Sequence, residues 1–174
     1  RAILSFPIDL KKIWYTKIIT CIIYIVLANT ILMICNVAGG FIIQQIFDIS
    51  MTISLTQALL GTLCIILTSI WNIPLCLWLV KKVGAFATLI LNVGMSFILG
   101  TLGASTRLWF VCPYSWVTRL MVPTLGILPN GEPVMRNALS TPLPLIIMTV
   151  CLSLVLFYVI SKLTVKSFIK QEVL

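Results

Sequence analysis

The sequence predicts an all-α fold, a polytopic bundle of transmembrane helices. Of its 174 residues, 60% are hydrophobic and only 9% are charged, whereas soluble domains carry about 25% charged residues. The mean hydropathy of +1.16 points the same way. Four uncharged stretches are long enough for a helix that crosses the roughly 30 Å hydrocarbon core. We therefore expect four spanning helices, an interfacial helix before them and a re-entrant segment before the last.

The segment from residue 1 to residue 17 is basic and amphipathic. Ser5 suits the N-cap position, and Pro7 and Asp9 suit the first turn of a helix. Apolar and cationic side chains follow at helical spacing: Leu10, Ile13, Trp14 and Ile18, with Lys11, Lys12 and Lys17 among them. This pattern predicts a helix that lies along the membrane surface. The simpler alternative is a basic flank of the first span with no further role.

The four spans are predicted at residues 18–43, 58–80, 83–104 and 143–160. Only Lys81 and Lys82 separate the second span from the third, so these two spans must form a tight helical hairpin. Pro74 should kink the second span, because proline removes a helical hydrogen bond. Small or mildly polar residues in the spans are expected to pack helices together: Ser96, Gly100 and Ala104 on the third span, and Asn29, Asn36, Asn72 and Asn92.

The basic residues predict the orientation of the chain. All eight lysines and Arg1 flank the spans on one side of the membrane, and the three remaining arginines lie on the other. Because cytoplasmic loops carry an excess of Lys and Arg, we expect a multi-pass protein of the cell membrane with both ends in the cytoplasm. This asymmetry accounts for the net charge of +8 without nucleic acid as a partner.

Residues 105–142 do not have the composition of an ordinary loop. Aromatic residues gather near the start, five prolines follow, and the apolar patch at 120–128 is too short to span. We expect an extracellular re-entrant segment that dips into the outer leaflet, with a turn at 129–131; an aromatic loop that rests on the bilayer is the alternative. Its aromatic side chains should form an outward-facing surface, whereas Arg107 and Arg119 should pair with lipid phosphates or cap the re-entrant turns. The positions singled out are Trp109, Tyr114, Trp116, Arg119, Pro123, Pro129 and Asn130.

No catalytic site is predicted. The chain has no histidine, its two Asp and two Glu are far apart in sequence, and its six cysteines include no C-x-x-C pair. We therefore expect no metal or cofactor on this chain and no enzymatic activity of its own. No ionisable residue lies inside an apolar stretch, which argues against an ion-coupled carrier.

Two stretches resemble a known family. Residues 6–18 read FPIDLKKIWYTKI, and residues 116–131 read WVTRLMVPTLGILPNG. Both are similar to ABC-2-type exporter permeases, above all to the lantibiotic-protection (immunity) permeases of Gram-positive bacteria, the MutE/EpiE group. In that group the first stretch is a cytoplasmic coupling helix. The second, with the pattern S-R-L-M-x-P-x-x-G-x-L-P-N-G, lies in the re-entrant region; Thr118 stands where the pattern has serine.

The resemblance implies that residues 1–174 form one permease domain, the third to sixth helices of a longer chain whose first two helices are missing. It implies an ATP-driven exporter with several partners: a separate ABC ATPase subunit that binds ATP and magnesium, a second permease chain, membrane lipid, and a lantibiotic or similar cationic antimicrobial peptide as cargo. The resemblance assigns coupling to Pro7, Asp9, Leu10, Lys11, Lys12 and Trp14, with Leu10 and Trp14 as apolar anchors on the ATPase. The alternatives are an ABC-2 permease for another cargo and a structural or sensor membrane subunit.

Overall fold

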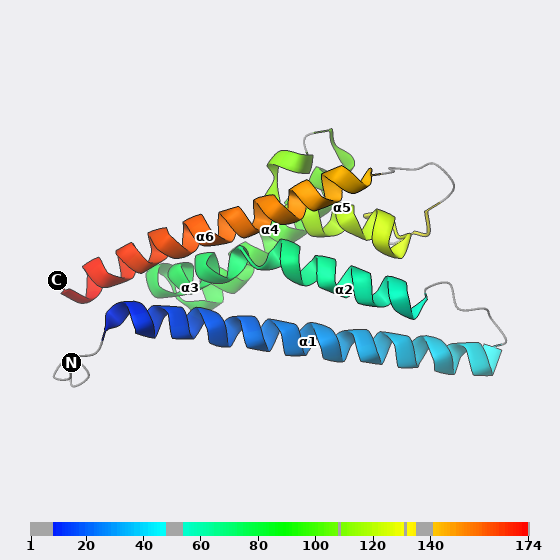
Figure 1. Cartoon of the computed structure of the whole chain (residues 1–174), viewed down its shortest axis with the longest axis horizontal. Coiled ribbons are helices and arrows are strands. Elements are labelled where there is room, and N and C mark those ends of the chain that lie inside the picture. Colours follow the sequence, from blue (N-terminus) through cyan, green and yellow to red (C-terminus); the bar gives the residue numbers. More distant parts are fainter. Residues whose placement is uncertain (1–8, 48–53, 108, 131, 135–140, 174) are drawn as a thin grey trace.

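The computed structural model describes residues 9–47, 54–107, 109–130, 132–134 and 141–173. Over these residues the chain is helical and has no strand, only an isolated bridge between Ile127 and Pro133. Figure 1 shows its elements: α1 (Leu10–Phe47), α2 (Leu55–Ser69), α3 (Asn72–Val83), α4 (Ala85–Ser105), the short helix η2 (Trp109–Val111), α5 (Pro113–Leu125) and α6 (Leu143–Val173). The predicted all-α class is confirmed.

Helix α1 is continuous over 38 residues. At 1.5 Å per residue it measures about 57 Å, well beyond the roughly 30 Å of hydrocarbon core. The prediction of a separate interfacial helix is wrong for residues 10–17, which form the first two turns of α1, because no proline or glycine interrupts the chain there. The Asp9 side chain accepts a hydrogen bond from the Lys11 amide at 2.9 Å and so caps the helix. Ser5 and Pro7 lie outside the described residues.

Helices α2 and α3 form one bent pair, with an angle of 46° between them. The bend falls at residues 70–71, just before Pro74 in α3. Proline has no N–H to donate to the carbonyl four residues earlier, and its ring crowds that carbonyl. The Ile73 amide bonds the Ile70 carbonyl instead, at 3.2 Å. The predicted kink is confirmed, and its position follows from the proline.

Helices α3 and α4 form the predicted hairpin, with Gly84 as the residue between them. The φ of Gly84 is +89°, a backbone conformation that residues with a Cβ rarely adopt. Across the hairpin, Asn72 Nδ2 donates a hydrogen bond to Asn92 Oδ1 at 2.8 Å. The two helices therefore run antiparallel from the lysine pair at the end of α3.

The predicted re-entrant region contains η2 and α5. Helix α5 runs beside α2 in the opposite direction, since Leu125 at its end lies against Gly61. Tyr114 at its start meets Trp71 edge-on, with ring centroids 5.1 Å apart. Gly126, with a φ of +69°, ends α5 in the left-handed conformation typical of helix C-caps.

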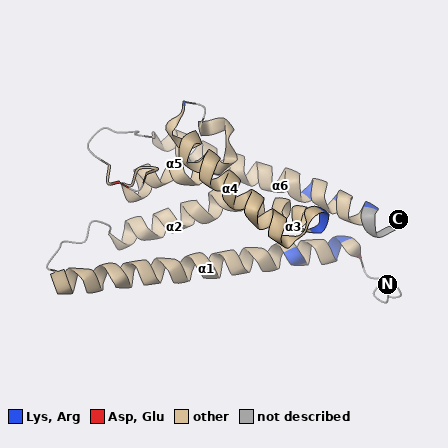
Figure 2. Ribbon diagram, turned by 180° about the vertical axis from the view of Figure 1, so that it is seen from behind, with Lys and Arg blue, Asp and Glu red and all other residues tan. Residues whose placement is uncertain are grey.

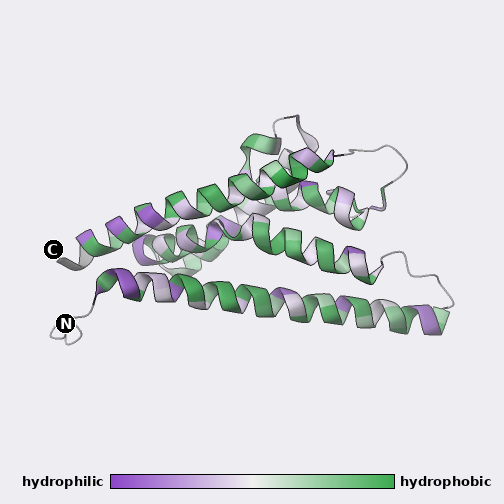
Figure 3. Cartoon of the chain, viewed as in Figure 1, coloured by the Kyte–Doolittle hydropathy of each residue, from purple (hydrophilic) through white to green (hydrophobic). Residues whose placement is uncertain are grey.

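Within the described part of the chain, three helices are long and apolar enough to cross a membrane: Leu10–Phe47, Ala85–Ser105 and Leu143–Lys170. The bent pair of α2 and α3 meets the same test together and is a fourth candidate if it is one span. Figure 3 shows that hydrophobic residues cover the middle of these helices and that hydrophilic residues mark the start of α1 and the end of α6. Large apolar side chains are exposed, as for Phe86 at 76% and Phe97 at 72%, which indicates a lipid environment.

Two buried aromatic clusters hold the helices together. The Trp14 cluster joins α1, α3 and α6 and consists of Trp14, Ile18, Ile73, Val165 and Phe168. The Trp71 cluster lies at the bend between α2 and α3 and consists of Trp71, Trp109 and Trp116, with partly buried side chains of α6 packed against it. The two clusters come close together at the start of α3, where Ile73 belongs to the first and Trp71 to the second.

Candidate functional site

The eight lysines belong to three helices that are far apart in sequence. They are Lys11, Lys12 and Lys17 of α1, Lys81 and Lys82 of α3, and Lys162, Lys166 and Lys170 of α6. Figure 2 shows the basic residues of these helices gathered at one end of the bundle, where α1 begins and α3 and α6 end. The fold therefore builds one cationic end, which we call the lysine end.

The indole of Trp14 is buried at the lysine end, with 2% of its surface exposed. It stacks on Phe168 of α6 at a centroid distance of 4.7 Å, and its Nε1 donates to the Thr164 hydroxyl at 3.1 Å. Trp14 therefore does not offer the free apolar surface expected of an anchor on a partner subunit. Helical spacing alone does not reveal this, because an inward-facing tryptophan and an outward-facing one follow the same pattern.

The other coupling residues differ in how accessible they are. Leu10 is half-buried and packs against the Trp14 cluster, whereas Lys11 and Lys12 are exposed. Asp9 is exposed and is engaged in capping α1, and Pro7 lies outside the described residues. The accessible part of the predicted coupling surface is thus cationic rather than apolar.

The tryptophans predicted for an outward-facing aromatic surface lie inside the fold. Trp109 is 7% exposed and Trp116 is 2% exposed, while Tyr114 is half-buried. Trp116 Nε1 donates to the Phe110 carbonyl at 2.9 Å, so the indole closes the segment on itself. The expected outward-facing aromatic surface is wrong for both tryptophans, because each finds a partner in the Trp71 cluster.

Arg119 connects α5 to the end of α4. Its Nη1 donates to the Ala104 carbonyl at 3.2 Å, and its guanidinium carbon lies 5.5 Å from the ring centroid of Trp109. The Ala104 carbonyl is among the last four of α4, which have no partner within the helix. Arg119 thus caps the end of α4, and the predicted pairing with a lipid phosphate or capping of a re-entrant turn stays a prediction. Its Nε is buried and makes no hydrogen bond within the described part of the chain.

The turn after α5 is closed by a backbone hydrogen bond of 2.8 Å from the Leu128 amide to the Glu132 carbonyl. Pro129 is half-buried in this turn, and Asn130 is exposed. Asn130 Nδ2 donates to the Glu132 carboxylate at 2.9 Å, and Asn130 Oδ1 accepts from the Glu132 amide at 3.2 Å. Pro123, within α5, is exposed. These residues shape the turn and are not brought together with Arg119 by any hydrogen bond among the described residues.

Small residues lie where α4 meets α5. A Cβ at Gly100 would lie 3.4 Å from the Thr118 hydroxyl, and Ala104 is fully buried. Gly103, which the four-residue repeat did not include, is tighter still: its Cβ would lie 3.2 Å from a side chain of α5. Ser96, the first member of the repeat, is exposed. The close approach predicted for this helix is therefore made by α5.

A polar network at the hairpin joins three helices. Asn92 Oδ1 of α4 accepts from Asn72 Nδ2 of α3 at 2.8 Å and from the Tyr114 hydroxyl of α5 at 3.2 Å. Asn29 and Asn36 instead bond carbonyls of their own helix, four residues earlier. The sequence did not separate these two kinds of asparagine. The signal that separates them is position, since Asn72 and Asn92 lie on the two arms of the predicted hairpin and Asn29 and Asn36 do not.

Comparison with models of known protein families, with curated proteins and with solved structures gave no significant match. The likeness to ABC-2 permeases therefore stays a prediction from two stretches of sequence. Among the described residues, no group of three or more His, Cys, Asp or Glu could hold a metal ion. The fold and its polar contacts have the features of a helical membrane bundle, with a cationic end and an internal hydrogen-bond network.

Proposed function

We propose that the chain is a transmembrane subunit of an ATP-driven exporter, a multi-pass protein whose lysine end faces the cytoplasm. The observation that carries the proposal is the lysine end, to which α1, α3 and α6 all contribute. An excess of Lys on one side is typical of the cytoplasmic side of membrane proteins. The stretches at 6–18 and 116–131 add the class of partner, an ABC ATPase, and the class of cargo, a lantibiotic or similar cationic peptide.

The partner surface would be the exposed cationic part of the lysine end. Lys11 and Lys12 lie in the first turn of α1, and Lys81 and Lys82 end α3 beside the hairpin. Charged groups at the rim of an interface steer association and fix its register. An acidic groove of the ATPase is therefore the complementary surface, and ATP and magnesium would be bound by that subunit alone.

Side-chain contacts connect the lysine end to α5. Trp14 bonds α6 through Thr164, and Trp78 Nε1 of α3 donates to the Ser167 hydroxyl of α6 at 2.9 Å. From α3 the Asn72–Asn92 bond leads to α4 and then to α5. A displacement of the lysine end by the ATPase would reach α5 through these contacts, because coupling is carried by contiguous packed and hydrogen-bonded groups.

Purification of the tagged chain from membranes of its native host tests this proposal. An ABC ATPase subunit should co-purify in comparable amount, and proteoliposomes of the complex should expel a fluorescent lantibiotic when ATP is added. The amount of ATPase subunit that co-purifies with the double variant Lys11→Glu/Lys12→Glu should be several-fold lower than with the wild type. Arg107→Glu is the matched control, since Arg107 is also exposed and basic but is not at the lysine end.

Two outcomes contradict the proposal. Absence of any ATPase subunit from the purified wild-type complex would favour a structural or sensor subunit. ATP-driven release of a lipid or an anionic peptide, with no release of the lantibiotic, would favour an ABC-2 permease for another cargo.

A further inference from the structure

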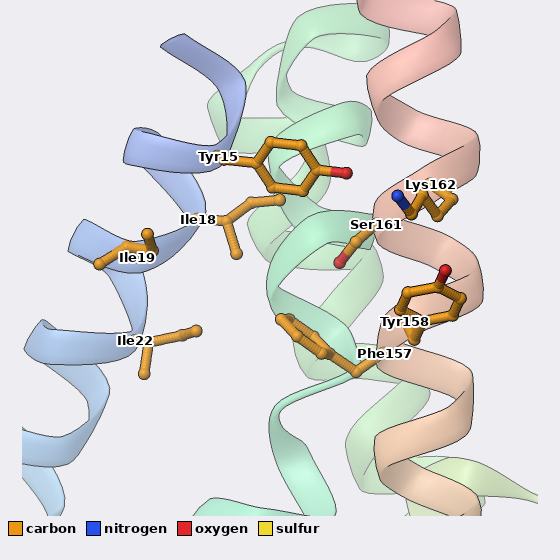
Figure 4. Close-up of a pocket in the computed structure, with 8 residues that line it drawn as sticks. All are labelled: Tyr15, Ile18, Ile19, Ile22, Phe157, Tyr158, Ser161 and Lys162. Atoms are coloured by element: carbon orange, nitrogen blue, oxygen red, sulfur yellow. The ribbon is translucent and has the colours of Figure 1, made fainter. Parts of the chain in front are cut away.

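A groove of about 420 Å³ lies between α1 and α6 near the lysine end. This volume falls within the range of about 300–1,000 Å³ that is usual for ligand pockets. Its lining, drawn in Figure 4, consists of Tyr15, Ile18, Ile19 and Ile22 of α1 and Phe157, Tyr158, Ser161 and Lys162 of α6. None of these residues is among the predicted coupling residues or takes part in the hydrogen-bond network at the hairpin, although Lys162 belongs to the lysine end.

The groove is polar at one end and apolar at the other. In Figure 4 the Tyr15 hydroxyl and the Lys162 amine lie toward the lysine end, and Ile19, Ile22 and Phe157 lie below them, toward the middle of the helices. Lys162 is exposed, and its Nζ lies 5.4 Å from the ring centroid of Tyr158. This gradient matches the order of groups along a phospholipid, with the charged phosphate first and the acyl chains after it.

Ser161 is unusual among the hydroxyl residues of the helices. The residue is 5% exposed, yet its Oγ has no hydrogen-bond partner among the described residues. Buried Thr149 on the same helix bonds the carbonyl four residues earlier, as serine and threonine in helices commonly do. Figure 4 shows the Ser161 oxygen turned into the groove instead. A buried hydroxyl without a partner is costly, so a ligand that bonds it is favoured.

The position of Lys162 fits the level of lipid phosphates. It follows Leu143, the first residue of α6, by 19 positions, which corresponds to about 28 Å along the helix. The hydrocarbon core is roughly 30 Å thick. If α6 crosses the bilayer from Leu143, Lys162 lies at the boundary between acyl chains and headgroups on the lysine side.

We propose that this groove binds one anionic phospholipid. Lys162 and the Tyr15 and Ser161 hydroxyls would hold the phosphodiester, and Ile19, Ile22 and Phe157 would line the first part of an acyl chain. The cation at the rim selects an anionic headgroup over a zwitterionic one. The site depends on the membrane location of the chain and not on the transport activity proposed above.

Native mass spectrometry of the full chain, released from detergent micelles with added lipid, tests this site. Dioleoyl phosphatidylglycerol is the probe and dioleoyl phosphatidylcholine is its neutral counterpart. Lys162→Gln should lower the affinity for phosphatidylglycerol about tenfold, the size expected for one charge-assisted hydrogen bond. Lys166→Gln is the control, because it removes the same charge from an exposed residue one turn further along α6 that does not line the groove.

Ser161→Ala supplies a second test that does not threaten the fold, since it removes a hydroxyl that has no hydrogen-bond partner in the described part of the chain. It should weaken phosphatidylglycerol binding severalfold, because the phosphodiester loses one hydrogen-bond donor. Equal binding of the two lipids by the wild type, or equal losses in Lys162→Gln and Lys166→Gln, would overturn the proposal. So would a dimer that forms without bound lipid, because a second copy would then fill the groove.

Discussion

The two aromatic clusters each bury a tryptophan to the same degree but hold it in different ways. Trp14 and Trp116 are both 2% exposed. The indole of Trp14 donates to a side chain, the Thr164 hydroxyl, 150 positions along the chain. The indole of Trp116 donates to a backbone carbonyl, that of Phe110, only six positions earlier. The first contact joins distant helices, and the second closes a local segment.

The cationic side chains near the two clusters also differ in what they contact. At the Trp14 cluster, Lys17 and Lys81 lie over the Phe168 ring, with Nζ at 5.6 Å and 4.1 Å from its centroid. At the Trp71 cluster, Arg119 lies over Trp109 and also bonds the end of α4. Contacts between lysines and an aromatic ring at an exposed site contribute about 0.5–1 kcal/mol. The comparison teaches that the lysine end is held by separable side-chain contacts, whereas the segment of η2 and α5 is fixed by hydrogen bonds to backbone carbonyls.

The largest effect is expected from Trp116→Ala. Replacement of a buried tryptophan by alanine leaves a cavity and costs about 3–5 kcal/mol. The midpoint of thermal unfolding in detergent should fall sharply. It is measured as the amount of monodisperse protein that remains after heating. Phe97→Ala is the control, since Phe97 is 72% exposed and should change the midpoint little. A Trp116→Ala protein as stable as the control would mean that the Trp71 cluster does not hold η2 and α5 in place.

Arg119→Ala should follow in size. It leaves the Ala104 carbonyl without its partner, and a buried polar group left unpaired costs about 1–3 kcal/mol. We expect less folded protein after extraction, with Arg107→Ala, an exposed arginine, as the comparison. Normal yield and stability of Arg119→Ala would show that the cap on α4 contributes nothing measurable.

Much of the fold follows from the sequence. Apolar runs of about 20 residues predict the long helices, and Pro74 and the Lys81–Lys82 pair predict the bend and the hairpin. The inward orientation of Trp109 and Trp116 does not follow from it, because aromatic side chains suit both a membrane interface and a protein core. Their partner Trp71 lies far upstream, and only the tertiary structure brings them together.

The length of α1 could not be predicted from the sequence either. A basic amphipathic stretch before a span has the same composition whether it turns along the membrane surface or continues the helix. The burial of Trp14 and Ile18 against α6 decides in favour of continuation. The site at the lysine end could be predicted as a charge pattern only, since packing, and not spacing, determines which of its residues remain accessible.

The smallest losses of stability are expected from two matched variants, one in each aromatic cluster. Trp116→Phe removes the donor to the Phe110 carbonyl and should cost about 1–3 kcal/mol. Trp14→Phe should cost less, on the order of 1 kcal/mol, because Thr164 keeps its own hydrogen bond to the Ser161 carbonyl at 3.1 Å. The thermal unfolding midpoints of the two variants, each compared with that of the wild type, measure this difference in stability. Equal losses would contradict the distinction between side-chain and backbone attachment.

The orientation of the lysine end is tested most directly by cysteine labelling in intact cells. All six cysteines are free and can be replaced by serine: Cys21, Cys35, Cys64, Cys76, Cys112 and Cys151. In that background, Lys82→Cys and Asn130→Cys place single thiols at exposed positions on opposite sides of the predicted membrane. A membrane-impermeant maleimide should label position 130 in intact cells and position 82 only after permeabilisation. Labelling of position 82 in intact cells would contradict a cytoplasmic lysine end.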